Sequence, residues 1–189
     1  LYKGKKFEDA IAQLEKSAKL ANELGDSEKA KKSTMYVGKI YTTSGQVMLK
    51  KEKPDMAIEE FNKALQINPK DYKTFLGMAM AYKEKGDLDL MLENADKTIS
   101  LVEGKEKAKK YGDKAKKLAA TELFNTGALE IKSNPAKAVE YLNKSLNYAD
   151  PSANTYYYLA IANNKAKNFS AAIENANKAL ELKEDDKSD

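Results

Sequence analysis

The sequence contains no cysteine, no histidine and no tryptophan, and all 33 of its basic residues are lysine, so arginine is absent as well. Without cysteine there is no disulfide, no thiolate metal site and no cysteine nucleophile. Without histidine the chain lacks the commonest general base and a common zinc ligand. Without arginine it lacks the planar group that binds carboxylates and phosphates through two parallel hydrogen bonds. These absences count against most enzyme mechanisms, against a metal or other cofactor, and against nucleic-acid binding.

Long apolar stretches are also absent. The longest uncharged one, Phe75 to Tyr82, is far too short to cross a bilayer, so we expect no transmembrane segment. The chain begins with Leu1 rather than methionine, and we expect that residues upstream of it have been removed. The lack of a signal-peptide pattern therefore carries no conclusion about export.

The residues that are present indicate an ordered, helical chain. Of the 189 residues, 42% are hydrophobic and 33% are charged, which is too much hydrophobe for a disordered chain. Apolar residues recur at helical spacing, and we find no convincing strand. An example is the run Phe7, Ala10, Ile11, Leu14, Ala18, Ala21 and Leu24.

A motif for a pair of helices occupies residues 41–69. Its letters are Tyr41-x2-Ser44-Gly45-x2-Met48, a turn at 52–54, then Ala57-x3-Phe61-x2-Ala64 and Pro69. This motif resembles the tetratricopeptide repeat, whose pattern W-x2-L-G-x2-Y, A-x3-F and P extends over 34 residues. Further copies begin at Phe75, Leu123 and Tyr156, and a partial copy surrounds Ala10. An ordinary helical bundle is the alternative, but five copies in register are hard to obtain by chance.

The resemblance implies an all-α, right-handed superhelical solenoid of antiparallel helix pairs, with about nine helices. We expect a single array over 1–189, with repeats at about 1–24 (partial), 27–70, 71–104, 105–151 and 152–185. Some letters depart from the family pattern: Glu103 and Glu184 replace the closing proline and Met91 replaces an alanine.

Long and short units alternate along the chain. The first residues of the second-helix motif are separated by 47, 34, 47 and 34 residues, which indicates an approximate 81-residue duplication of a two-repeat unit. We expect the helices beside each long spacing to extend about two turns beyond a standard repeat and to form two projections, around Gly25 and Gly104. These helices are 16–24, 27–48, 88–102 and 106–131.

The concave face of such a solenoid, formed by the first helix of each pair, is the surface on which partners bind. The resemblance therefore predicts a groove with methionine and aromatic character, suited to a peptide or protein partner. The predicted groove residues are Lys39, Thr42, Gln46, Lys73, Leu76, Met80, Phe124, Ala128, Asn154, Tyr157 and Ile161. Some of these side chains could instead pack against neighbouring repeats.

One subset of the family holds a partner's terminal carboxylate between lysine and arginine residues four positions apart, together with asparagine. The positions four residues after Lys39 and Lys73 are Thr43 and Gly77, and arginine is absent. A clamp of that kind is therefore not expected here.

Positive charge is concentrated in residues 105–118, where seven lysines face two acidic residues. This segment could contact an acidic protein, an anionic lipid surface or another polyanion, or it could simply be a solvated helix extension, which we favour. The acidic residues at 184–189 show no calcium-loop spacing and fit a frayed end. The candidate basic contacts are Lys107, Lys109, Lys110, Lys114 and Lys117.

No catalytic group of residues emerges from the sequence, although a Ser–Lys pair is left open. We therefore predict a non-catalytic protein-interaction scaffold. The alternative is a self-associating structural or assembly component of the cell envelope, because the helix 7–24 would leave Ala10, Leu14 and Leu24 uncovered at an open N-terminal edge. Export to the periplasm of a Gram-negative bacterium is slightly favoured over the cytoplasm.

Overall fold

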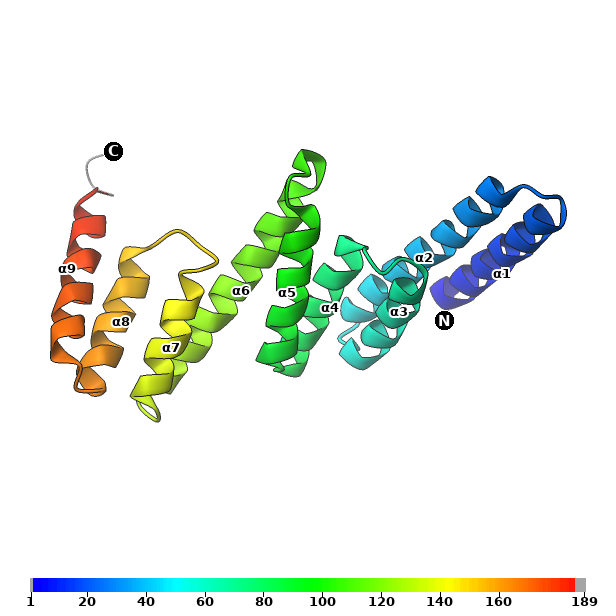
Figure 1. Cartoon of the computed structure of the whole chain (residues 1–189). Coiled ribbons are helices and arrows are strands. Elements are labelled where there is room, and N and C mark those ends of the chain that lie inside the picture. Colours follow the sequence, from blue (N-terminus) through cyan, green and yellow to red (C-terminus); the bar gives the residue numbers. More distant parts are fainter. Residues whose placement is uncertain (1, 186–189) are drawn as a thin grey trace. The chain divides into compact units, whose positions relative to one another are not determined.

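The computed structural model describes residues 2–185, and in this range the chain forms nine α-helices and one short 3₁₀ helix (Figure 1). Side chains are described for residues 6–183. The helices are α1 (Tyr2–Glu23), α2 (Ser27–Leu49), α3 (Pro54–Ile67), α4 (Tyr72–Lys85), α5 (Leu88–Val102), the 3₁₀ helix η1 (Glu106–Ala108), α6 (Lys109–Glu130), α7 (Pro135–Ser145), α8 (Ala153–Lys165) and α9 (Phe169–Asp185). The all-α fold of helix pairs predicted from the sequence is confirmed.

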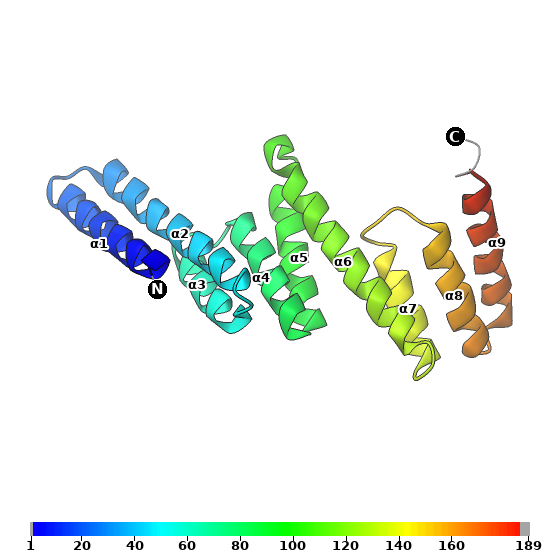
Figure 2. The same ribbon diagram turned by 180° about the vertical axis from the view of Figure 1, so that it is seen from behind.

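The chain divides into two compact units, Leu1–Ala115 and Lys116–Asp189. In the first unit each of the helices α1 to α4 packs against the next one along the chain, and α2 also contacts α4. In the second unit α7 packs against α8, and α8 against α9. The pairs α1–α2 and α8–α9 lie side by side in both views (Figures 1 and 2). Whether the whole chain is one array of five repeats stays a prediction, and the acidic residues 184–189 lie outside the described side chains.

Polar residues define where the helices begin. The side chains of Asp26, Asp71 and Asp87 accept hydrogen bonds from backbone amides in the first turns of α2, α4 and α5. Asn134 and Ser152 do the same for α7 and α8. These caps satisfy amides that have no partner within the helix, which typically stabilises a helix by about 1 kcal/mol.

The first helices of the long units have the predicted extra length. Helices α2 and α6 contain 23 and 22 residues, whereas α4 and α8 contain 14 and 13. Helix α5 has the predicted bounds, but its 15 residues exceed the 14 of α3 by only one, so it is not two turns longer than its neighbour. Helix α5 ends where Val102 packs against Gly112, on which a Cβ atom would lie 2.7 Å from the valine side chain, and Gly104 then turns the chain at a φ of 70°.

The duplication is visible in the positions of the helices. Helices α3 and α7 begin at Pro54 and Pro135, α4 and α8 at Tyr72 and Ala153, and α5 and α9 at Leu88 and Phe169. Each pair of starting residues is 81 positions apart, which is the period that the sequence predicts.

The core of the first unit centres on Phe61, which is fully buried in α3. A Cβ atom added to Gly45 of α2, or to Gly77 of α4, would lie 2.5 Å from the Phe61 ring. The ring is therefore held between the backbones of two helices, and the space it fills exists because both positions are glycine.

In the second unit different residues form the corresponding contact between the helices. Leu142 occupies the position of Phe61 and packs against Gly127, on which a Cβ atom would lie 2.8 Å from its Cγ. Tyr158, which stands at the position of Gly77, is half-buried against the core around Leu142. A smaller residue at one position is thus accompanied by a larger one at the other.

This packing leads to a first prediction. Replacing Gly77→Ala forces the new methyl group into the Phe61 ring, and we expect the free energy of unfolding to fall by about 1–3 kcal/mol. In a Phe61→Leu background the same change should cost less, with a coupling of roughly 0.5–3 kcal/mol. Urea denaturation of the wild type, both single variants and the double variant measures this coupling. Additive effects of the two substitutions would contradict the packing account.

The turn after the first helix of each short unit leads to a second prediction. Gly86 follows α4 with a φ of 74°, and its counterpart 81 residues later is Lys167, with a φ of 65°. A non-glycine residue is strained in this left-handed conformation. We therefore expect Lys167→Gly to stabilise the protein by up to about 1 kcal/mol, and Gly86→Lys to destabilise it by roughly 1–2 kcal/mol. Thermal unfolding compares the two variants, and equal shifts of the same sign would contradict this interpretation.

Candidate functional site

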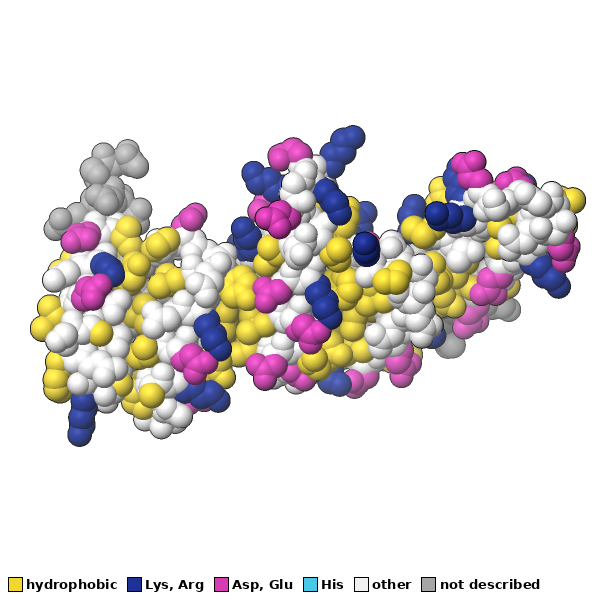
Figure 3. All heavy atoms as spheres, in the orientation of Figure 1, with side chains coloured by type: hydrophobic (Ala, Val, Ile, Leu, Met, Phe, Trp, Pro, Cys, Tyr) yellow, Lys and Arg dark blue, Asp and Glu magenta, His cyan; other side chains and the backbone are white. Residues whose placement is uncertain are grey.

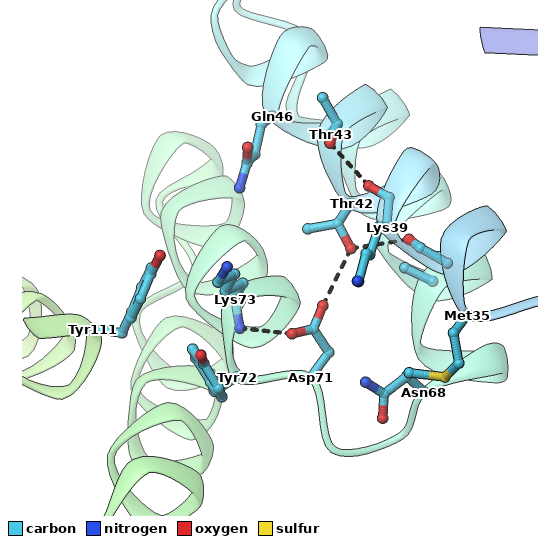
Figure 4. Close-up of a pocket in the computed structure, with 12 residues that line it drawn as sticks. Met35, Lys39, Thr42, Thr43, Gln46, Asn68, Asp71, Tyr72, Lys73 and Tyr111 are labelled. Atoms are coloured by element: carbon cyan, nitrogen blue, oxygen red, sulfur yellow. Dashed lines mark hydrogen bonds between the residues drawn. The ribbon is translucent and has the colours of Figure 1, made fainter. Parts of the chain in front are cut away.

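The first unit contains an open cavity of about 520 Å³ on one side of α2 (Figure 4). Residues from five segments surround it: α2, the end of α3, the turn between α3 and α4, the start of α4, and the start of α6 (Figure 4). We call it the α2–α4 pocket. Its lining residues are Met35, Gly38, Lys39, Thr42, Thr43, Gln46, Ala64, Asn68, Asp71, Tyr72, Lys73 and Tyr111.

Hydrogen bonds fix one wall of the α2–α4 pocket. The hydroxyl of the buried Thr74 donates to Asp71 Oδ2 at 2.7 Å and lies 2.7 Å from the hydroxyl of Thr42, which is also buried. The second carboxylate oxygen of Asp71 accepts the backbone amide of Lys73 at 3.2 Å. The single carboxylate of the pocket is therefore already engaged, both in capping α4 and in joining α4 to α2.

Lysines and tyrosines form the other wall. The ammonium groups of Lys73 and Lys110 lie 5.4 and 5.3 Å from the centre of the Tyr111 ring, and the Tyr111 ring itself lies 5.1 Å from that of Tyr72. Lys39 is exposed, and its ammonium lies 4.6 Å from the Tyr36 ring. At these distances an ammonium is attracted to the ring face but keeps its charge for another partner.

The α2–α4 pocket therefore presents positive charge beside aromatic rings. Lys39 and Lys73 are exposed, and Gln46 and Asn68 add amide groups that can donate or accept hydrogen bonds. The pocket offers no nucleophile paired with a base. Its chemistry suits the binding of a carboxylate or another anion that carries an apolar neighbour.

Four predicted groove residues meet in this pocket: Lys39, Thr42, Gln46 and Lys73. The prediction that Thr42 and Leu76 offer contact area is not met, since they are only 6% and 9% exposed. Thr42 is turned into the contact with Thr74, and Leu76 is buried in the first unit. Met80, on the face of α4 that also carries Lys73, is 46% exposed.

The other predicted groove residues lie in the second unit. Phe124 and Ile161 pack against the core around Leu142, and the Phe124 ring meets the Tyr158 ring edge-on at 5.1 Å. Ala128 is half-buried, whereas Asn154 is exposed and Tyr157 is 57% exposed. Asn154 and Tyr157 are thus the two of this set with exposed side chains.

The predicted basic contacts are exposed. Lys107, Lys109, Lys110 and Lys114 lie at and after the turn between α5 and α6, where lysine side chains gather in Figure 3. Lys117 is exposed in the second unit. Through Tyr111, Lys110 connects this basic segment to the α2–α4 pocket.

Part of the pocket was not predicted from the sequence, namely Met35, Asn68, Asp71, Tyr72 and Tyr111. Asp71 could have been found as the capping residue before α4, because aspartate directly before an amphipathic helix is a common start signal. Tyr111 stands in the extended start of a first helix, where the repeat pattern assigns no role to a side chain.

The comparison with family models finds the tetratricopeptide repeat over residues 38–71. This segment contains the second half of α2 and all of α3, which pack against each other as a helix pair. Residues 38–71 of the chain therefore form a tetratricopeptide repeat. Tetratricopeptide folds typically serve as non-catalytic protein-interaction scaffolds.

Solved structures similar to this chain share little sequence with it. The crystal structure of MamA protein is 14% identical, with 94% of this chain and 93% of that chain covered and a TM-score of 0.48. MamA 41-end from Desulfovibrio magneticus RS-1 is 13% identical, with 94% and 97% covered and a TM-score of 0.45. The TPR2AB domain of yeast Sti1 in complex with pHSP90 is 20% identical, with 93% and 78% covered and a TM-score of 0.34. The search of curated proteins gives no match.

Among the helices of residues 2–185, none combines the length and the apolar character needed to cross a membrane.

The hydrogen bonds of the pocket wall lead to a third prediction. Thr74→Val keeps the shape of the side chain but removes the donor to Asp71 and the partner of the buried Thr42 hydroxyl. We expect the free energy of unfolding to fall by about 1–3 kcal/mol. Thr43→Val is the matched control, since the Thr43 side chain is exposed and bonds only to the Lys39 carbonyl of its own helix. Equal losses in urea denaturation would contradict a special role for the buried pair.

Proposed function

We propose that this protein is a non-catalytic scaffold that binds an acidic peptide segment of a partner protein in the α2–α4 pocket. The observation that carries the proposal is the placement of two exposed lysines, Lys39 and Lys73, around a cavity whose one carboxylate is already hydrogen-bonded.

The charges favour an acidic group as the part of the partner that enters the pocket. Because Asp71 is held by Thr74 and by the Lys73 amide, it is a poor competitor for the two ammonium groups. Lys110 and the other lysines of the basic segment extend the positive potential beyond the pocket. This field attracts an acidic segment and disfavours a basic one.

The shape and the apolar lining favour a peptide. The cavity is open, and it combines charge with the side chains of Met35, Tyr72 and Tyr111. Methionine and tyrosine side chains supply contact area that adapts to different neighbours of the acidic group. A segment with one carboxylate beside a bulky apolar residue uses both parts of the lining.

The fourth prediction tests this site. Peptides selected from a random displayed library on the wild-type chain should be enriched in aspartate and glutamate. We expect a Lys39→Glu, Lys73→Glu variant to bind these peptides roughly tenfold more weakly or worse, measured by fluorescence anisotropy. The matched control is Lys19→Glu, Lys51→Glu, which reverses two exposed lysines outside the pocket.

The circular dichroism of both variants should match that of the wild type, because all four lysines are exposed. Selected peptides without acidic residues would count against the proposal, as would equal binding by the two variants. The contact would then be sought on another surface.

Assembly is a second candidate function, and one feature of α9 favours it. Phe169, Ile173 and Leu180 are 60%, 64% and 60% exposed, and their spacing places them on one stripe of the helix. Leu20 and Leu24 at the end of α1 are also exposed, at 54% and 75%, whereas Ala10 and Leu14 are half-buried. Light scattering distinguishes the candidates, since a mass that is independent of concentration would count against self-assembly. An envelope location is part of this second candidate.

A further inference from the structure

A second cavity, of about 430 Å³, lies between α1 and α3 with α2 as its floor. We call it the α1–α3 groove. Its lining residues are Phe7, Glu8, Ile11, Ala12, Glu15, Tyr41, Ser44, Met48, Met56, Glu59, Glu60 and Lys63. All of them belong to the first unit, and none of them lines the α2–α4 pocket.

The two cavities use opposite faces of α2. Successive residues of an α-helix are rotated by about 100°. Thr42 and Gln46, which line the α2–α4 pocket, therefore point away from Ser44 and Met48, which line the α1–α3 groove. A partner can occupy one cavity without displacing a partner in the other.

The rim of the α1–α3 groove is acidic. It has four glutamates and a single lysine, Lys63, which forms an ion pair with Glu60 at 2.7 Å. In the described part of the chain no ion pair joins Glu8, Glu15 or Glu59 to another side chain. The hydrogen bond from Lys63 to Glu60 raises the pKa of Lys63, and the charge of Glu59 adds to the rise. Three carboxylates therefore remain for a positively charged occupant.

The interior of the groove is apolar. Phe7 and Ile11 of α1, Met48 of α2 and Met56 of α3 contribute side chains to it. Met56 of α3 is a large hydrophobic residue, yet its side chain is 46% exposed. Methionine side chains adapt their shape to an incoming apolar group at little cost.

We propose that the α1–α3 groove is a second docking site, which binds a basic amphipathic helix of a partner protein. The bulky apolar side chains of that helix contact Met48 and Met56, and its lysine or arginine residues flank them and face Glu8, Glu15 and Glu59. The carboxylates supply charge complementarity, and the apolar floor supplies the buried area.

The basic segment of a second copy of this chain lacks the apolar part of such an occupant. Among residues 105–117, Ala108, Gly112 and Ala115 are buried, and Tyr111 is half-buried against Tyr72. The segment therefore offers lysines without an exposed bulky apolar side chain. This composition favours a different protein as the occupant.

The chemistry of this groove is specific to the first half of the duplicated chain. At an offset of 81 residues, Lys137 stands at the position of Met56 and Tyr141 at that of Glu60. The same helix face thus lacks the exposed methionine in the second half. An acidic groove with a methionine floor is consequently not required by the repeat itself.

The experiment uses methionines as local probes in the full chain labelled with ¹³C at the methionine methyl groups. Of the six methionines, Met48 and Met56 line the α1–α3 groove and Met35 lines the α2–α4 pocket. The first ligand is a synthetic amphipathic helix of about 15 residues with a leucine stripe flanked by lysines. Two matched peptides replace either all leucines by serine or all lysines by glutamate.

We expect the leucine–lysine peptide to shift the Met48 and Met56 resonances and to leave Met35 unchanged. Glu15→Gln, Glu59→Gln should weaken its binding roughly threefold to tenfold, because two exposed charge contacts are lost. The matched control, Glu23→Gln, Glu84→Gln, changes two exposed glutamates outside the groove and should bind as the wild type does. Met56→Ala, which removes an exposed side chain, should also weaken binding.

Several results would overturn the proposal. Shifts at Met35 in place of Met48 and Met56 would place the peptide in the other pocket. Equal binding of the serine–lysine peptide would show that charge alone accounts for binding. Binding of the leucine–glutamate peptide would show that the glutamates of the groove do not select a basic partner. Self-association detected by light scattering and lost in Glu15→Gln, Glu59→Gln would identify a second copy as the occupant.

Discussion

The Phe61 ring, held between Gly45 of α2 and Gly77 of α4, is the contact on which the first unit depends. It joins the two helices of one pair to the first helix of the next, so that α2, α3 and α4 have fixed relative positions. Both cavities of the first unit are lined by residues of α2 and α3. Because interiors are close-packed, a shift of one helix at this contact moves the walls of both. The geometry of both cavities thus depends on two positions where glycine leaves room for the Phe61 ring.

Local features of the fold could be predicted from the sequence. The starts of α2 and α5 and the end of α5 coincide with the predicted ones, since apolar periodicity and capping residues act within a few positions of the chain. The contact at the end of α5 could not be predicted, because there Val102 meets Gly112 of the next helix. Register within the repeat predicts that Lys39, Gln46 and Lys73 share one face, and all three line the α2–α4 pocket. The same register predicts that Thr42 contacts a partner on this face. Its hydroxyl instead points inward, because it bonds to Thr74 and Asp71, which are distant in sequence.

The two cavities differ in how they could be recognised. The α2–α4 pocket lies on the face that the repeat pattern assigns to binding, so the resemblance led to it. The α1–α3 groove combines residues from three helices separated by up to 56 positions, from Phe7 to Lys63. The repeat motif includes the residues that α2 contributes, but no repeat letter marks those of α1 and α3. It is recognised only when the helices are packed, by an exposed methionine beside carboxylates that form no ion pair with the described residues.

The duplication separates what the fold requires from what function can change. Between the halves, Phe61 and Gly77 become Leu142 and Tyr158, so bulk lost at one core position accompanies bulk gained at another. On the surface no such compensation occurs: Met56 becomes Lys137 and Lys73 becomes Asn154. A core constraint couples its residues through volume, whereas exposed positions change independently of each other. The lysines of the α2–α4 pocket and the methionine of the α1–α3 groove therefore belong to the part of the sequence that packing leaves open, which is where binding specificity can be encoded.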